Sequence, residues 1–553
     1  MNSSTAYALG YTGAGVHVGV MDSGALLEKH PDLAGSRFHT VKVDDLAYGT
    51  SGNRYPQNTG TTSSTGAFTP DSEVPVDGNW DQKFNDSHGT HVTGTVGGNR
   101  DGSEFHGVAF GADVHVANTG GNDNTNYGPF QDPKFFYMTW NKTAEELNTA
   151  NDGRGGFINN SFGTNTRIVD QKTTGPDGGS TGVHLPVDTI QQVEYEYFLF
   201  KKYAPHMTGQ ALGWDEDNST KYDFVDAAYK AAKDNNVVQV FTTGNRDFKN
   251  PFYRPLYPYF NPEAEQNWIA VAGMRRGTEA GTYTLYSTFN EAGLAKWWTV
   301  AAPGENIYGS KVNTTTGEAT WGNSSGTSMA APHVTGALAV LMQRYDQMDA
   351  TQVRDVMLTT ASHRNPDGSI FDGWTAKEGQ VDERYGWGMP DLEKGMYGPG
   401  QLLGKFEYDM AAGSLDVWSN DISAEALKQR KAEEEAWVKS VTTDGSTVDP
   451  SLVGDYELGE SVEVVGLEDD SITEEEAKQW RTAYLQKRVD AIKARLESGD
   501  KYQGSLVKQG DGTLVMTGSN SYEGMTKVEA GTLLAFAESV GTDDTVTVSG
   551  GTF

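Results

Sequence analysis

The sequence predicts an α/β domain with a mainly parallel sheet, followed by a helical insertion and the start of a right-handed β-solenoid stalk. Short β-rich runs alternate with helical stretches up to about residue 400, which is typical of a parallel sheet. Two charged segments with helical periodicity come next, and short strands separated by glycine end the sequence. Because 553 residues exceed what one core can hold, we divide the chain into a domain at 1–400, a junction at 401–422, a charged helical hairpin at 423–500 and a truncated repeat at 501–553.

The first apolar run, residues 16–21, has the composition of a strand buried on both faces, and Asp22 follows it directly. Open α/β sheets build their sites at the carboxyl ends of parallel strands, so a charge at this position is a candidate functional group. Taken alone, Asp22 could equally be the cap of a turn or a helix. Partner residues elsewhere in the sequence must decide between the two interpretations.

Two further positions could act together with Asp22. His88 is expected at the start of a helix, in a Ser-His-Gly-Thr-His run whose glycine gives the backbone clearance. A second apolar strand, which begins at residue 237, ends in Gly-Asn, and the side-chain amide of Asn245 can donate to an oxyanion. His91 and His333 lie close to these motifs, and we interpret them as packing or hydrogen-bonded residues.

The most informative run is Gly-Thr-Ser-Met-Ala-Ala-Pro-His, which begins at Gly326 and places Ser328 directly ahead of a predicted helix. Gly326 is expected to permit a tight turn, and Pro332 is expected within the first helical turn, where a missing N–H costs nothing. Ser328 would then lie at a helix N-terminus, where free N–H groups and the helix dipole favour negative charge. This setting suits a nucleophile whose reaction develops an oxyanion.

The order Asp22, His88, Asn245, Ser328 and the residues around each of them resemble the subtilisin-like serine peptidases (subtilases) over about residues 7–400. The resemblance implies that Asp22 orients His88, that His88 acts as general base and then acid, and that Ser328 forms the acyl-enzyme. It also implies an oxyanion hole made by Asn245 and the N–H of Ser328. We therefore predict a serine endopeptidase that acts on proteins and peptides and needs no cofactor.

The same resemblance points to a substrate-binding segment at Ser161, Phe162 and Gly163. It looks like the extended segment that pairs with the substrate backbone and walls the first specificity pocket. Neither this segment nor the residues around Asn245 identify a buried carboxylate at the pocket floor. A Lys or Arg before the cleaved bond would then be buried without a partner, so we predict a preference for large apolar residues.

No metal site is predicted. Many subtilases hold calcium between a carboxylate, which Asp32 matches, and a loop that corresponds to residues 98–105 here. Arg100 lies in that loop and is expected to place a cation where calcium would be. Because Ca²⁺ takes oxygen ligands, we expect no calcium at this position.

Outside these motifs, the sequence before the final repeat contains two long segments and one pair of predicted helices. Residues 49–86 are expected to be loop, and residues 164–217 form an aromatic-rich insertion near the substrate segment. In the hairpin at 423–500, Thr473 and Glu476 predict a capping box, and Gly499 predicts the end of that helix. Apolar residues at helical spacing indicate a face that packs on the hairpin itself or on the catalytic domain: Leu485, Val489, Ile492 and Leu496.

From residue 502 the sequence consists of short alternating strands separated by Gly, Asn and Asp, which favours rungs of a β-solenoid. This region resembles the passenger-associated repeat of autotransporters, and residues 416–421 resemble their junction between protease and stalk. A solenoid that ends on a bare rung exposes a sheet edge. We therefore expect the sequence to be a fragment, with further stalk and a C-terminal membrane β-barrel that would anchor or export it.

Composition restricts the partners and the compartment. A formal net charge of −32 argues against nucleic acid and anionic membranes as partners. The absence of cysteine fits export through an oxidising periplasm, and no apolar run approaches the roughly 20 residues that span a bilayer. We interpret Met1 as standing in place of a removed leader. The expected product is a monomer that is secreted or held at the bacterial cell surface and is not itself embedded in a membrane.

Two alternatives remain open at this point. The first is a non-enzymatic surface adhesin or scaffold that retains a peptidase fold and binds a host partner through its solenoid and aromatic insertion. A binding protein has no physical need for nucleophile, base, orienting carboxylate and oxyanion donor together, which argues against it. The second is a processing peptidase with one intended target, which the sequence cannot separate from a peptidase of broad range.

Overall fold

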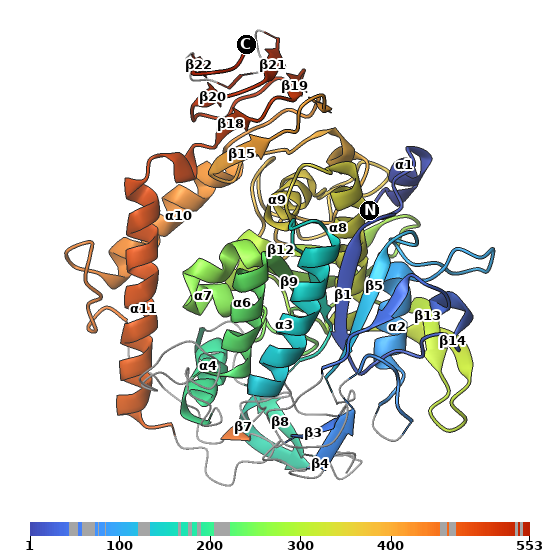
Figure 1. The fold of residues 1–553 in the computed structure, drawn as a ribbon. Coiled ribbons are helices and arrows are strands. Elements are labelled where there is room, and N and C mark those ends of the chain that lie inside the picture. Colours follow the sequence, from blue (N-terminus) through green and yellow to red (C-terminus); the bar gives the residue numbers. More distant parts are fainter. Residues whose placement is uncertain are drawn as a thin grey trace.

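A computed structural model describes most of the chain (Figure 1). The described residues are 1–43, 54–57, 72–75, 77–82, 85–119, 133–163, 167–174, 180–184, 190–203, 222–453, 462–463, 472–536, 540–541 and 546–553. Parts of the predicted loop at 49–86 and of the insertion at 164–217 lie outside these residues.

The centre of the molecule is an eight-stranded sheet in which β11, β10, β9, β6, β1, β5 and β2 follow one another and β12 pairs with β10. Its strands are β1 (His17–Asp22), β2 (Phe38–Thr40), β5 (Asp113–Asn118), β6 (Gly156–Asn160), β9 (Val237–Thr242), β10 (Trp268–Arg276), β11 (Tyr283–Leu285) and β12 (Thr299–Pro303). Among the described strand pairs of this sheet, β10 and β11 are antiparallel and all the others are parallel. The predicted α/β domain with a mainly parallel sheet is therefore confirmed.

Helices cover both faces of this sheet. The helices α2 (His88–Gly97), α8 (Thr327–Arg344) and α9 (Ala350–Thr360) share one hydrophobic cluster with Val18 and Val20 of β1. The helices α3 (Pro133–Ala150) and α6 (Phe224–Asn235) share a second cluster with Met21 of the same strand. Alternate residues of β1 thus face opposite layers, because successive side chains of a strand point to opposite sides. This explains the continuous apolar run that precedes Asp22.

Smaller elements surround the sheet. They are α1 (Ser3–Ala8), η1 (Pro31–Leu33), β3 (Arg54–Gln57), β4 (Ser72–Pro75), β7 (Arg167–Thr174), β8 (Ser180–His184), α4 (Ile190–Tyr203), α7 (Tyr257–Phe260), η2 (Pro262–Asn267), η3 (Gly293–Trp298), β13 (Ile307–Val312), β14 (Ala319–Ser324) and η4 (Lys394–Tyr397). The expectation that 49–86 is entirely loop is wrong, because β3 and β4 form an antiparallel pair within it. In the 164–217 insertion, β7 pairs with both β8 and β17 (Val462–Glu463).

Two helices, α10 (Glu425–Val441) and α11 (Glu474–Glu497), follow the catalytic domain and lie along its flank (Figure 1). The predicted capping box of Thr473 and Glu476 is present, with Thr473 Oγ1 accepting from the Glu476 N–H at 3.2 Å. The helix α11 contacts α10, α4, α7 and η2, so it packs on its partner helix and on the catalytic domain alike. A buried ion pair between Arg481 and Glu194 (2.6 Å) joins it to α4.

The last strands form two parallel sheets beside the catalytic domain. One contains β15 (Lys405–Asp409), β18 (Ser505–Gln509), β20 (Thr526–Val528) and β22 (Val546–Val548), and the other contains β16 (Leu415–Trp418), β19 (Thr513–Met516) and β21 (Thr532–Ala535). The segment 401–422, predicted as a junction, thus contributes the first strand of each sheet, and the helices α10 and α11 are inserted after them in the sequence. The short turn η5 (Asp500–Tyr502) leads back into β18.

None of the described helices combines the length and the apolar character needed to cross a membrane.

Candidate active site

Asp22 and His88 meet at the carboxyl end of β1. Asp22 is the last residue of the strand and His88 is the first residue of α2. The His88 Nδ1–H donates to Asp22 Oδ1 at 2.7 Å, and the two side chains are only 11% and 3% exposed. Because the carboxylate holds the proton on Nδ1, the opposite nitrogen Nε2 presents its lone pair as a base.

The backbone at the start of α2 is fixed by neighbours of this pair. Asp86 Oδ1 accepts from the His88 N–H at 2.9 Å and from Ser23 Oγ at 2.9 Å, and Ser23 Oγ accepts from the Gly89 N–H at 3.0 Å. A Cβ on Gly89 would lie 2.3 Å from the carbonyl oxygen of Gly24. Glycine is therefore required by close approach of two backbones, and that approach brings His88 to the end of β1.

Ser328 is the second residue of α8, so the predicted place at a helix N-terminus is confirmed. The expectation for Pro332 is wrong: it is the sixth residue of the helix, beyond its first turn. Proline has no N–H, so the carbonyl of Ser328, four residues earlier, has no helical donor. Ser161 Oγ donates to that carbonyl at 2.8 Å and replaces the missing bond.

The hydroxyl of Ser328 points to the same neighbour. Ser328 Oγ donates to the carbonyl oxygen of Ser161 at 2.9 Å. A hydroxyl carries a single proton, so this bond excludes a simultaneous donation from Ser328 to His88. In this structure the side chain of Ser328 is therefore held by the backbone of Ser161, in the predicted substrate-binding segment.

Asn245 follows β9 and lies against the start of α8. Its Oδ1 accepts from the N–H and from the hydroxyl of Thr327, both at 2.9 Å, which directs Nδ2 away from Thr327. A Cβ on Gly326 would lie 3.5 Å from Asn245 Nδ2 and 3.6 Å from the Ser328 nitrogen. Two N–H donors thus flank the space beside Gly326, as an oxyanion hole requires.

The role expected for Gly326 needs correction. Its φ of 161° is extended backbone that other residues also adopt, and not a tight turn. The absence of a side chain matters instead because a Cβ would occupy the space between Asn245 Nδ2 and the Ser328 N–H.

The predicted substrate-binding residues follow β6 directly. Ser161 and Phe162 are buried, and Gly163 is partly exposed. A neighbour missed at the sequence level is Arg254, which is 1% exposed and lies with its guanidinium carbon 5.6 Å from the Phe162 ring centroid. Its Nη2 is 3.2 Å from where a Cβ on Gly163 would be. Gly163 and Arg254 are 91 positions apart in the sequence, so no sequence motif indicates this contact.

At the position where many subtilases hold calcium, Asp32 has other partners. Its Oδ2 accepts from Ser310 Oγ at 2.7 Å and from Trp321 Nε1 at 2.8 Å. Arg100 is exposed, and its guanidinium carbon lies 5.2 Å from the centroid of the Phe110 ring. Both donors bind Oδ2, and Oδ1 of Asp32 is buried without a hydrogen-bond partner among the described residues. The absence of calcium here stays a prediction.

His91 and His333 are packing and hydrogen-bonded residues, as the sequence suggested. His91 Nε2–H donates to the Ile307 carbonyl at 3.0 Å, and His333 Nδ1–H donates to the Met329 carbonyl at 2.7 Å. Burial lowers the pKa of both rings to about 4. They are therefore neutral at pH 7 and serve packing and backbone hydrogen bonding.

Two family models and several known proteins are similar to this chain. A family model described as "Subtilase family" matches residues 13–388, and one described as "Passenger-associated-transport-repeat" matches residues 506–535. The solved structure of fervidolysin from Fervidobacterium pennivorans aligns with a TM-score of 0.40 and 22% identity, over 72% of this chain and 46% of that one.

Two curated relatives resemble a larger part of the chain. An extracellular serine protease of Serratia marcescens is 26% identical over 579 residues, which cover 100% of this chain and 44% of that protein. The Neisserial autotransporter lipoprotein NalP of Neisseria meningitidis serogroup B is 27% identical over 447 residues, which cover 76% of this chain and 37% of that protein. The chain thus spans less than half of the length of these relatives.

Proposed function

The chain belongs to the subtilase family, and on that premise we propose that it is a serine endopeptidase that acts through Asp22, His88 and Ser328. The observation that carries the proposal is the 2.7 Å hydrogen bond from His88 Nδ1 to Asp22 Oδ1, because it leaves the lone pair on Nε2, so that His88 can act as a base. No cofactor enters this chemistry.

The reaction begins when Ser328 Oγ attacks the substrate carbonyl carbon while its proton passes to His88 Nε2. Asp22 accepts from Nδ1 throughout and stabilises the imidazolium that forms. The oxyanion receives hydrogen bonds from Asn245 Nδ2 and the Ser328 N–H, and it collapses to an acyl-enzyme as His88 protonates the leaving amine. Water then attacks the acyl group with His88 again as base, which releases the acid and restores Ser328.

Substrate binding offers a way to free the nucleophile. An extended peptide that adds as a strand to the 161–163 segment presents its own N–H groups to that segment's carbonyls. Competition for the Ser161 carbonyl would release the Ser328 hydroxyl, which could then turn toward His88. The resting hydrogen bond is in this way exchanged for a catalytic one when a peptide is present.

We propose proteins and peptides as substrates, with a large apolar residue before the cleaved bond. Buried Arg254, whose Nη2 lies beside Gly163, supports this preference because a second cation would be repelled there. The same guanidinium also favours an acidic residue before the cleaved bond, which the sequence did not indicate. Cleavage after Leu, Phe, Tyr, Met, Glu and Arg should therefore be compared.

For the rest of the chain we propose the passenger of an autotransporter, secreted or at the bacterial cell surface, and acting as a monomer. The repeat match at 506–535 and the two parallel sheets that contain β18 and β19 support a β-solenoid stalk after the domain at 1–400. Within this division, the segment 423–500 is a helical insertion between the first and second strands of each sheet.

Digestion of denatured casein tests the proposal. The protein should degrade casein, and a phosphonyl inhibitor that modifies activated serines should stop the reaction. Absence of proteolysis against casein and against a broad peptide library would instead favour a scaffold that keeps the fold without the activity.

A further inference from the structure

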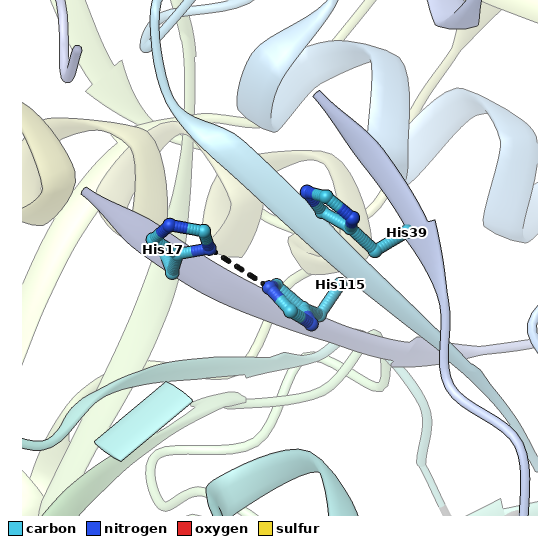
Figure 2. A group of neighbouring side chains, drawn as sticks. All are labelled: His17, His39 and His115. Atoms are coloured by element: carbon cyan, nitrogen blue, oxygen red, sulfur yellow. Dashed lines mark hydrogen bonds between the residues drawn. The ribbon is translucent and has the colours of Figure 1, made fainter. Parts of the chain in front are cut away.

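Three histidines from distant parts of the sequence gather at the end of the sheet opposite to the candidate active site. His17 begins β1, His39 lies in β2 and His115 lies in β5 (Figure 2). Asp22 ends β1, and five residue steps of about 3.3 Å place it about 16 Å along the strand from His17. The cluster is therefore separate from the catalytic residues.

The strand register puts the three rings on one face. His39 pairs directly with His115, and His17 pairs with Asp113, two residues before His115. Residues two apart on a strand share a face, so all three side chains project to the side covered by α3. One ring nitrogen from each histidine lies within 4.8 Å of the others.

Carboxylates orient the rings of two of these histidines. His115 Nδ1–H donates to Glu146 Oε2 on α3 at 3.0 Å, and His39 Nε2–H donates to Asp113 Oδ1 at 2.8 Å. Asn151, just after α3, holds the backbone of His17: its Oδ1 accepts from the backbone N–H at 2.9 Å and its Nδ2–H donates to the backbone carbonyl at 2.8 Å. Histidines that bind metals characteristically give their other N–H to such acceptors, which fixes the tautomer and the ring orientation.

The tautomer of His115 turns its one lone pair toward His17. With its Nδ1 proton held by Glu146, His115 has its lone pair on Nε2, and this nitrogen lies 2.9 Å from His17 Nδ1. Two nitrogens bound to one tetrahedral Zn²⁺ at about 2.0–2.1 Å are about 3.3 Å apart, so a small opening of this pair admits an ion. Binding would displace the proton that now lies between His17 and His115.

The charged groups and the exposure around the three histidines allow a cation to reach and bind the imidazole nitrogens. Arg37 and Lys142 interact with Asp113 and Glu146, so attraction for an ion comes from imidazole lone pairs more than from net charge. His39 is 38% exposed and Asp113 is 23% exposed, which gives an ion access from solvent.

We propose that His17, His39 and His115 bind one divalent transition-metal cation, with Zn²⁺ as the probe. Three imidazoles suit Zn²⁺, Cu²⁺ or Ni²⁺, whereas Ca²⁺ and Mg²⁺ take oxygen ligands. Asp113 or water completes the coordination. The ion would tie the edge strand β2 to β5 and β1, so its effect is on stability and not on the proteolytic step.

Calorimetric titration of the full chain, without a histidine tag and stripped with EDTA, tests this site with ZnCl₂ at pH 7.5. We expect one Zn²⁺ per chain and a rise in Tm with Zn²⁺, because a ligand that binds only the folded state stabilises it. His39→Gln changes a ligand that is 38% exposed and should weaken binding by about tenfold or more. The matched control His106→Gln changes an exposed histidine outside the cluster and should bind as the unchanged protein does.

Two outcomes would overturn the proposal. One is the absence of a stoichiometric Zn²⁺, which would make the cluster a hydrogen-bonded set of rings only. The other is unchanged binding in His39→Gln, which would place the ion elsewhere, for example on His88, where it would also inhibit proteolysis. Neither readout depends on the proposed peptidase activity.

Discussion

Ser161 and Ser328 hydrogen bond to each other twice: each hydroxyl donates to the carbonyl of the other residue, at 2.8 Å and 2.9 Å. The first bond exists because Pro332 cannot donate to the carbonyl of Ser328 inside α8. The second holds the nucleophile against the segment that is proposed to bind the substrate. The start of α8 and the end of β6 are thereby locked together at the candidate active site.

This relationship makes Ser161 a positioning residue whose loss is measurable. Ser161→Ala should cost about 1–3 kcal/mol of unfolding free energy, since the Ser328 carbonyl and the Asn159 amide both lose a partner. It should also lower kcat by about tenfold with little change in KM, if about 1.4 kcal/mol of alignment is lost. Ser310→Ala is the matched control: it removes another buried serine hydroxyl and should reduce stability without reducing kcat. An equal kcat in both variants would refute the positioning role.

Ser328→Ala should fold normally and lose essentially all peptidase activity. The expected loss is about 10⁶-fold, the size reported when subtilisin loses its nucleophile, because the alanine cannot form an acyl-enzyme. Hydrolysis of a peptide ester measures the activity, and circular dichroism checks the fold. Mass spectrometry after reaction with a phosphonyl inhibitor should find one adduct, on Ser328; an adduct on another serine with activity retained in the variant would contradict the assignment.

Asn245→Ala should lower kcat far more than it raises KM, by roughly 10²–10³-fold, as for oxyanion-hole donors in this family. Thr327→Val is the informative comparison. It removes one of the two bonds to Asn245 Oδ1 but keeps the Thr327 N–H at 2.9 Å, so it should have the smaller effect. If Asn245→Ala changed mainly KM, Asn245 would be a substrate-binding residue instead.

Cleavage of a peptide library, read by mass spectrometry, should show few sites after Lys or Arg. An unpaired cation would enter a partly dry pocket, and it would also meet the buried guanidinium of Arg254. Large apolar residues should dominate the profile, at least tenfold over Arg if the penalty exceeds about 1.4 kcal/mol. A profile dominated by Lys or Arg would show that a carboxylate from one of the insertions reaches the pocket.

Acid should loosen α10 from the catalytic domain before the domain itself unfolds. Burial by itself would raise the pKa of Glu265, but the charge and hydrogen bonds of Arg430 outweigh it and lower that pKa from 4.5 to about 2. A carboxyl whose pKa falls on folding contributes stability above its unfolded pKa, and that stability is lost as the pH drops from about 4.5 toward about 2. Hydrogen exchange of α10 should therefore accelerate across this window.

Glu265→Gln serves as the control for the acid effect. It removes the bidentate pair with Arg430 (2.6 Å for each bond), so the free energy of local opening of α10 should fall by about 2 kcal/mol. The amides of α10 should therefore already exchange faster at pH 7. Its exchange should then depend less on pH than that of the unchanged protein. Equal acid sensitivity in both would assign the effect to another pair, such as Glu434 with Arg495.

Much of the fold and of the candidate site follows from local sequence. The apolar run before Asp22, the alternation of strands and helices, and the capping box at Thr473 each depend on neighbours within one turn or one strand. Such patterns also place Asp22, His88 and Ser328 at ends of elements, and parallel strands bring those ends to one edge. The errors are local as well: a helix that begins at Thr327 moved Pro332 into its interior, and the extended backbone of Gly326 replaced the expected turn.

What the sequence determined is thus the type and direction of each element and the identity of the residues at its ends, because these depend on periodicity and capping within short windows. Only the tertiary structure decided which distant residues touch. The mutual bonds of Ser161 and Ser328, the guanidinium of Arg254 beside Gly163, and the meeting of His17, His39 and His115 all depend on lateral register between strands and on helix placement. Register between segments far apart in the chain is set by burial of whole faces, which no single stretch of sequence encodes.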